Sequence, residues 1–138
     1  GEMSRHVNFN RADRWTPHVI GAAIEVHRLQ GPGLLESIYT RCLRHEFSLR
    51  GIPAVQELAV PVIYKDLTFE EPLRLDFYVD HCLVVEAKAV ERILPIHVAQ
   101  LLSYMRLVDA PVGLLVNFHE LVLKDGIRRL TLRGADQP

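Results

Sequence analysis

The chain lacks the features that mark several protein classes. It has only two cysteines, Cys42 and Cys82, and their spacing matches no close-spaced ligand pattern, which argues against a disulfide framework and a cysteine-based zinc site. No apolar stretch approaches the length needed to span a membrane, and no signal peptide is evident. We therefore expect a cytoplasmic protein.

The chain also lacks an excess of positive or negative charge. The formal net charge is -1, so any contact with nucleic acid must come from a local basic patch. The composition, 49% hydrophobic and 24% charged over 138 residues, is that of one globular domain with a real core. We expect a flexible segment at 1–15, a folded domain at 16–133 and a short tail at 134–138.

The most informative stretch is 73–90, which holds two strand-like runs separated by Asp80-His81. The second run is apolar except for Glu86 and Lys88. A carboxylate and an ammonium group in a buried strand cost free energy unless they are paired or bind a metal. These two residues are therefore the first candidates for a functional site.

Burial favours one register for this hairpin. A two-residue turn at Asp80-His81 scatters polar side chains over both faces, because a shift of one residue exchanges the faces of a strand. A turn from Asp80 to Cys82 instead gives one wholly apolar face. That face is formed by the cross-strand pairs Val79–Leu83, Phe77–Val85 and Leu75–Ala87.

In this register Asp76 lies opposite Glu86, with Lys88 further along the same face. Directly opposed Cβ atoms are about 5 Å apart, which allows two carboxylates to share one divalent cation. Without a cation they repel, and one tends to stay protonated. We predict a metal site here. The alternative is a half-exposed hairpin with cross-strand ion pairs, against which the apolar Cys82 and Val84 on the same face argue.

The remaining pattern indicates an α/β domain. The expected elements, in order, are helices at 17–29 and 34–49, a strand at 55–64 interrupted by Pro61, the central hairpin, a helix at 96–108, a strand at 112–118 and a hairpin at 121–132. A strand, helix and strand in succession imply a right-handed parallel crossover. Asp125-Gly126 suits the type I′ turn of a terminal hairpin.

Two helices carry further candidates. Glu36 lies in the first turn of helix 34–49, where the helix dipole favours an ionised carboxylate. His97, Gln100 and Tyr104 share one face of helix 96–108, which directly follows the strand of Lys88 and is expected to close over the same site. The alternatives are a merely favourable first-turn acid and an amphipathic helix with polar groups at the boundary of the core.

Three motifs carry a resemblance to a known family. Asp76 with E86-A-K88 resembles the D…(D/E)xK signature of the PD-(D/E)xK nuclease superfamily, although Leu75 replaces the usual preceding proline. Q100-L-L-S-Y104 is similar to the QxxxY motif of its RecB-like branch. G33-L-L-E36-S-I-Y39 matches the motif that names the GxxExxY family. The resemblance covers roughly residues 17–131.

The resemblance implies a restriction-endonuclease-like fold, with a central mixed sheet flanked by helices in the order α-α-β-β-β-α-β. It also implies divalent-metal-dependent hydrolysis of phosphodiester bonds in nucleic acid, and we expect DNA rather than RNA as the substrate. Asp76, Glu86 and the backbone carbonyl of Ala87 are the expected ligands of Mg²⁺ or Mn²⁺, hard ions that prefer oxygen. Glu36 is expected to complete the coordination or to bind a metal-linked water, with Glu25 a weaker candidate at the same edge.

The other site residues receive supporting roles. Lys88 is expected to orient the attacking water or to stabilise developing charge, and Gln100 and Tyr104 to position the nucleophile or a phosphate. Arg74 either pairs with Asp76, which we rank slightly higher, or contacts the nucleic-acid backbone.

Two functional classes and one assembly question remain open. The first class is a metal-dependent nuclease. The second is a non-catalytic nucleic-acid or protein-binding module that keeps the fold. Intact Asp76, Glu86 and Lys88 favour the first class. The edge of the predicted hairpin at 121–132 is also a candidate interface for a homodimer.

Overall fold

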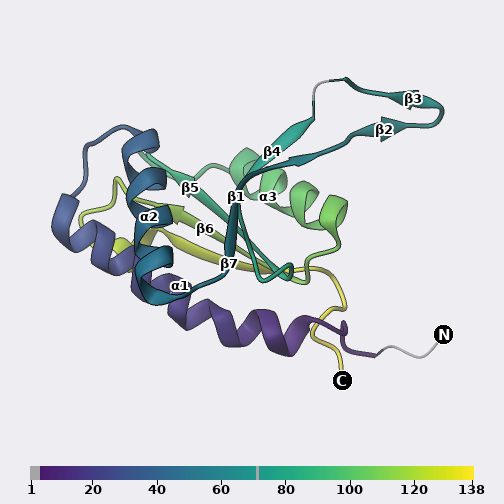
Figure 1. The fold of residues 1–138 in the computed structure, drawn as a ribbon, viewed down its shortest axis with the longest axis horizontal. Coiled ribbons are helices and arrows are strands. Elements are labelled where there is room, and N and C mark those ends of the chain that lie inside the picture. The colour runs from purple at the N-terminus through teal and green to yellow at the C-terminus, as the bar shows by residue number, and fades with distance from the viewer. Residues whose placement is uncertain (1–3, 71) are drawn as a thin grey trace.

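A five-stranded mixed sheet lies at the centre of the computed structural model, which describes residues 4–70 and 72–138 (Figure 1). Its strands in spatial order are β1 (Ala54–Val60), β4 (Leu73–Val79), β5 (Leu83–Lys88), β6 (Val112–Asn117) and β7 (Ile127–Thr131). β5 and β6 are parallel, and all other neighbours are antiparallel. This confirms the predicted α/β fold with a mixed sheet.

Helices cover both faces of the sheet (Figure 1). α1 (Phe9–Gln30) and α2 (Glu36–Arg50) pack on one face, while α3 (Pro95–Val108) packs on the other. β6 is buried throughout, and β5 is buried except for the half-buried Lys88, because both strands are enclosed on both sides. This explains their nearly continuous apolar sequences. α3 connects these two parallel strands, as the predicted crossover requires.

The first helix begins earlier than predicted. We expected it to start at residue 17, but α1 begins at Phe9, and Phe9 and Ala12 are buried in the core. The Thr16 hydroxyl donates to the Ala12 carbonyl at 3.2 Å, so it bonds back into a helix that is already formed. Residues 1–3 of the predicted flexible segment lie outside the described residues.

The predicted register of the central hairpin is confirmed. Phe77 pairs with Val85, Tyr78 with Val84 and Val79 with Leu83, around a turn closed by a hydrogen bond of 3.0 Å from Cys82 N–H to the Val79 carbonyl.

One face assignment in that hairpin is wrong. Leu75 packs with the α3 core rather than with Phe77, which packs beneath α1 and α2. The register between β1 and β4 skips the level of Glu57 and Asp76. Glu57 there has a φ of 53°, in the left-handed region, so the regular alternation of side chains is interrupted.

The predicted terminal hairpin is also wrong. Residues Leu123–Gly126 form a short 3-10 helix, η1, and only β7 follows as a strand, paired with β6. A Cβ on Gly126 would lie 2.6 Å from the Asn117 carbonyl oxygen, so this glycine serves a close backbone approach and not a hairpin turn. The hairpin itself is absent, but its second segment, β7, forms one edge of the sheet, so the homodimer interface that we expected at this edge stays a prediction.

A two-stranded arm projects from the body (Figure 1). Its strands are β2 (Ile63–Tyr64) and β3 (Leu67–Thr68), joined by a turn at Lys65-Asp66. Pro61 interrupts the long predicted strand between β1 and this arm. Within the described ranges, no helix combines the length and apolar character needed to cross a membrane.

Candidate active site

The β4–β5 hairpin opens where its acidic side chains begin. Backbone pairing between the strands ends at Phe77–Val85, and carboxylates occupy the next level. The Asp76 N–H donates to Glu86 Oε1 at 3.1 Å, and the Ala87 N–H donates to Asp76 Oδ2 at 2.9 Å. The structure therefore brings Asp76 and Glu86 side by side, as the register predicted, with each carboxylate bonded to the opposite strand.

Burial controls the ionisation of this pair. Glu86 is only 5% exposed, and burial together with the nearby charge of Asp76 raises its pKa to about 9. Burial also raises the pKa of Asp76, while the hydrogen bond from Ala87 opposes that rise. Among the described residues neither carboxylate has a salt-bridge partner, and the pairing of Arg74 with Asp76 that we ranked higher is not observed.

α3 brings two more predicted residues to the pair. The Lys88 ammonium donates to Gln100 Oε1 at 3.2 Å. Tyr104 is 9% exposed, and its pKa is raised first by burial and then by the charges of Glu86 and Asp76. The face of α3 that we predicted to close over the site therefore does so. The third residue of that face, His97, caps the helix, because its Nδ1 accepts the Leu94 N–H at 2.9 Å.

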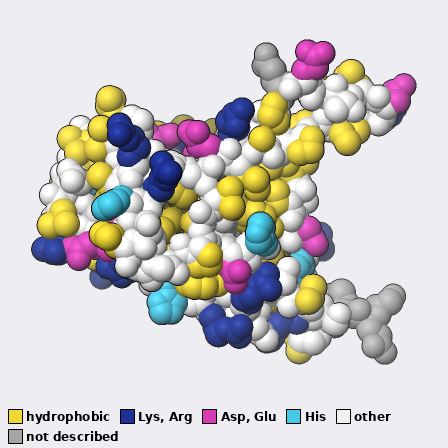
Figure 2. Space-filling model, viewed as in Figure 1, with side chains coloured by type: hydrophobic (Ala, Val, Ile, Leu, Met, Phe, Trp, Pro, Cys, Tyr) yellow, Lys and Arg dark blue, Asp and Glu magenta, His cyan; other side chains and the backbone are white. Residues whose placement is uncertain are grey.

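α2 approaches the same group from its N-terminal end. Glu36 is the first residue of that helix, and burial raises its pKa. The charge of Lys88 and hydrogen bonding by the Ala89 backbone lower the same pKa, while the charge of Asp76 raises it. Glu36 is thus within electrostatic reach of both residues. Figure 2 shows acidic and basic side chains gathered along the upper edge of the body, between α2 and the arm.

The donor chemistry fits a hard divalent cation. Two adjacent carboxylates offer oxygen ligands, which Mg²⁺ and Mn²⁺ prefer, and neither has a cationic partner among the described side chains. A bound cation would favour the ionised form of Glu86, which burial disfavours. In residues 4–70 and 72–138, however, no group of three or more His, Cys, Asp or Glu side chains is arranged to hold a metal. Glu36 therefore does not form a ready three-ligand set with the pair.

A comparison with protein families agrees with this geometry. The PD-(D/E)XK nuclease superfamily matches residues 13–130 of the chain. The chain belongs to the PD-(D/E)XK nuclease superfamily. Searches of curated proteins and of solved structures returned no significant match. Membership supports a hydrolytic enzyme with a nucleic-acid substrate.

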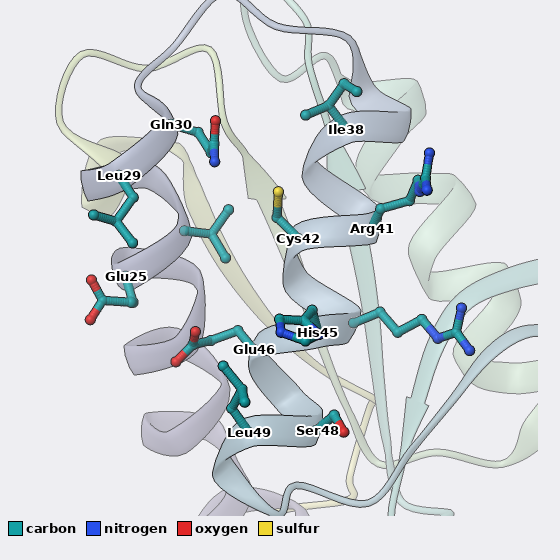
Figure 3. Close-up of a pocket in the computed structure, with 12 residues that line it drawn as sticks. Glu25, Leu29, Gln30, Ile38, Arg41, Cys42, His45, Glu46, Ser48 and Leu49 are labelled. Atoms are coloured by element: carbon teal, nitrogen blue, oxygen red, sulfur yellow. The ribbon is translucent and has the colours of Figure 1, made fainter.

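A surface groove of this PD-(D/E)XK protein lies away from the carboxylate pair. The groove has a volume of about 780 Å³ and runs between α1 and α2, and Glu25 is its one lining residue among the predicted site residues (Figure 3). Glu25, the weaker acidic candidate, lines this groove and binds Arg28, whose Nε lies 2.9 Å from Glu25 Oε1. The structure thus assigns Glu25 to a surface ion pair and not to the carboxylate cluster.

Sequence reasoning missed one buried polar residue beside the PD-(D/E)XK cluster. Asn117 is fully buried at the end of β6, where its Oδ1 accepts the Val90 N–H at 3.1 Å and its Nδ2 donates to the Val90 carbonyl at 2.8 Å. Phe118 N–H also donates to the Lys88 carbonyl at 2.9 Å. These bonds fix the chain that leaves β5 after Lys88. The sequence offered one sign of this residue, a single asparagine at the end of an otherwise apolar strand.

Proposed function

We propose that the protein is a divalent-metal-dependent nuclease that hydrolyses phosphodiester bonds in DNA, and that it belongs to the GxxExxY group with a RecB-like QxxxY helix. One observation carries the proposal. The adjacent carboxylates of Asp76 and Glu86, without a cationic partner among the described residues, lie beside Lys88 in a chain of the PD-(D/E)XK superfamily. A purely structural carboxylate pair would gain by having a lysine or arginine as its direct partner.

The two carboxylates are the proposed metal ligands. Asp76 and Glu86 each use one oxygen to accept a backbone N–H, which fixes the side chains on facing strands. The Ala87 carbonyl is the third proposed ligand. A bound Mg²⁺ or Mn²⁺ would supply a water of lowered pKa and neutralise charge on the phosphate. Glu36 is proposed to act through a metal-linked water, since it forms no three-carboxylate set with the pair.

The remaining residues orient the reactants. Lys88 is held by Gln100 at 3.2 Å, so its ammonium is available to orient the attacking water or to stabilise charge on the phosphate oxygens. From α3, Gln100 bonds Lys88 and Tyr104 lies near the charges of Glu86 and Asp76, and both are proposed to position the water or the phosphate. Hydrolysis joins the water oxygen to phosphorus, breaks one P–O bond and passes a proton to the departing oxygen.

Cleavage assays test the proposal. Linear, circular and single-stranded DNA, and RNA for comparison, are incubated with the wild type and with Lys88→Ala in the presence of Mg²⁺, Mn²⁺ or EDTA. We expect metal-dependent cleavage of DNA by the wild type and a rate about 100-fold lower for Lys88→Ala. Arg106→Ala, an exposed change in the last turn of α3, is the matched control and should leave the rate unchanged.

Two results would overturn the nuclease assignment. One is no cleavage of any substrate by the folded wild type with either metal. The other is equal cleavage by the wild type and Lys88→Ala. A melting temperature that does not rise with Mn²⁺ would point instead to a binding module, because a ligand of the folded state raises that temperature by mass action.

A further inference from the structure

Tyr39, three residues after Glu36, lies in the first turn of α2. Tyr39 is fully buried, and its ring stacks on Phe118 with centroids 4.6 Å apart and an interplanar angle of 7°. Its hydroxyl donates to the Gly31 carbonyl at 2.6 Å and accepts the Leu34 N–H at 3.0 Å. A side chain of the helix's first turn therefore bonds both ends of the loop that precedes the helix.

No cap of the usual kind fixes this helix end. The N-cap residue is Leu35, whose side chain cannot accept a hydrogen bond from the first turn. The loop before it contains Gly31 and Gly33 with φ values of 70° and 97°, a region that glycine enters more readily than other residues. The start of α2, and with it the direction of Glu36, therefore depends on the bonds of the Tyr39 hydroxyl.

The same loop is tied to the end of β6. His119 Nε2 lies 2.9 Å from the Leu34 carbonyl oxygen, and the His119 ring contacts the Tyr39 ring edge-on. The neighbouring Asn117 fixes Val90, two residues after the end of β5, through two hydrogen bonds to its backbone. Residues at the end of β6 thus hold both the loop before α2, which leads to Glu36, and the chain that leaves β5 after Lys88.

We propose that Tyr39 is a positioning residue, whose hydroxyl holds the first turn of α2 so that Glu36 faces Lys88 and Asp76. The inference rests on the proposed function, because it assigns Glu36 an effect on divalent-cation binding. It also supplies a physical reason for the spacing G33-x-x-E36-x-x-Y39. The glycine permits the loop, the glutamate faces the site, and the tyrosine one turn later closes the loop onto the helix.

Mn²⁺ binding to the full chain tests this role. Tyr39→Phe keeps the ring on Phe118 and removes only the hydroxyl. The Mn²⁺ dissociation constant, measured by calorimetric titration with Mn²⁺ alone, should rise about 10-fold, as is typical when a group that orients a ligand is lost. Glu36→Gln should weaken binding at least as much, and the double variant should bind no more weakly than Glu36→Gln alone, because both changes remove the same interaction.

A second buried tyrosine provides the matched control. Tyr78 is 8% exposed, and its hydroxyl also bonds two backbone groups, the carbonyls of His81 at 2.9 Å and Val108 at 3.3 Å. Tyr78→Phe should lower the melting temperature by an amount similar to that for Tyr39→Phe. It should leave the Mn²⁺ dissociation constant within about twofold, since a general loss of stability is not a loss of positioning.

The possible results separate the two proposals. If the wild type does not bind Mn²⁺, the proposed function fails. If the wild type binds Mn²⁺ but either Tyr39→Phe or Glu36→Gln leaves its affinity unchanged, the positioning role alone is overturned. Should Tyr39→Phe fail to fold, His119→Phe removes the second tie to Leu34 and keeps a ring against Tyr39. Unchanged Mn²⁺ affinity in that variant would likewise overturn the role.

Discussion

The two ends of the β4–β5 hairpin differ in what joins the strands. At the turn end, three consecutive residue pairs from Phe77–Val85 to Val79–Leu83 form a regular ladder, and the side chains on both faces are buried. At the other end, the backbone groups of Asp76 and Ala87 donate to carboxylates of the facing strand. The backbone groups therefore stay satisfied where the strands separate.

Two aspartates illustrate the difference. Asp80, at the turn end, accepts the indole N–H of Trp15 at 3.0 Å and lies 3.2 Å from the Arg11 guanidinium. Asp76, at the open end, has no cationic partner among the ion pairs of the described residues. An aspartate that supports structure is neutralised by the fold, whereas Asp76 is left with capacity for an external cation. The regular ladder at the turn end keeps the Asp76 carboxylate in position.

The largest expected effect is a difference in DNA cleavage between variants of these two aspartates. Asp76→Asn should reduce DNA cleavage in Mg²⁺ by at least about 1,000-fold, because it removes an anionic ligand of the proposed cation. Asp80→Asn, the matched change on the same hairpin, should leave the cleavage rate within about twofold and lower stability by at most about 1 kcal/mol. Single-turnover rates measure the first effect. Equal losses in both variants would show that the two ends do not differ in role.

The next effect tests the rigidity of the turn end. Phe77 is fully buried and packs edge-to-face on Phe47 with ring centroids 5.1 Å apart. Phe77→Ala should lower the free energy of unfolding in urea by about 3–5 kcal/mol, since it leaves a cavity in the core. Phe69→Ala on the arm, where the side chain is 47% exposed, should cost less than about 1 kcal/mol. Similar losses would contradict the packing described.

A smaller effect is the pH dependence of stability without divalent metal. Because burial raises the pKa of Glu86 to about 9, the folded state binds a proton that the unfolded state has released above pH of about 4.3. Its contribution to stability is therefore complete below that lower value and is lost as pH rises through 9. In EDTA, urea unfolding between pH 6 and 8.5 should show stability falling by up to about 1.4 kcal/mol per pH unit.

Glu86→Gln isolates this titration. The variant should remove most of the decline with pH, although Asp76 and Glu36, whose pKa values are also raised, contribute in the same direction. An unchanged decline in Glu86→Gln would mean that Glu86 is ionised in the metal-free protein. The open end of the hairpin would then be more hydrated than its burial indicates.

Local periodicity was sufficient to predict the centre of the site. The side-chain period of a strand is two, so a single choice of turn fixed the register and placed Asp76 beside Glu86. Helical spacing similarly placed Gln100 and Tyr104 on one face of α3. These predictions succeeded because each depends on residues close together in the sequence and on one buried face.

Predictions that depend on distant packing failed or were not possible. Asp125-Gly126 has the sequence of a hairpin turn, but Gly126 is held against the Asn117 backbone within η1. Thr16-Pro17 has the sequence of a helix start, but α1 begins about two turns earlier, at the buried Phe9. The separation of the strands at Asp76 depends on carboxylates replacing ladder bonds, which residue periodicity does not encode.

The smallest expected effect is a change in DNA affinity when Arg74, near the open end of the hairpin, is replaced. Arg74 is exposed on β4 two residues before Asp76, and it takes part in none of the salt bridges of the described residues. We expect Arg74→Gln to weaken DNA binding a few-fold and to reduce by about 1 the slope of log affinity against log salt, the effect of losing one phosphate contact. The cleavage rate at saturating DNA should not change.

A second exposed arginine is the control for this change. Arg129 already pairs with Asp13, its Nη2 lying 2.6 Å from Asp13 Oδ1, so Arg129→Gln should leave the salt slope as it is. A slope unaltered in Arg74→Gln would remove Arg74 from the nucleic-acid surface. A fall in the saturated rate would place it instead with Lys88, because a residue that only binds the backbone raises KM without lowering kcat.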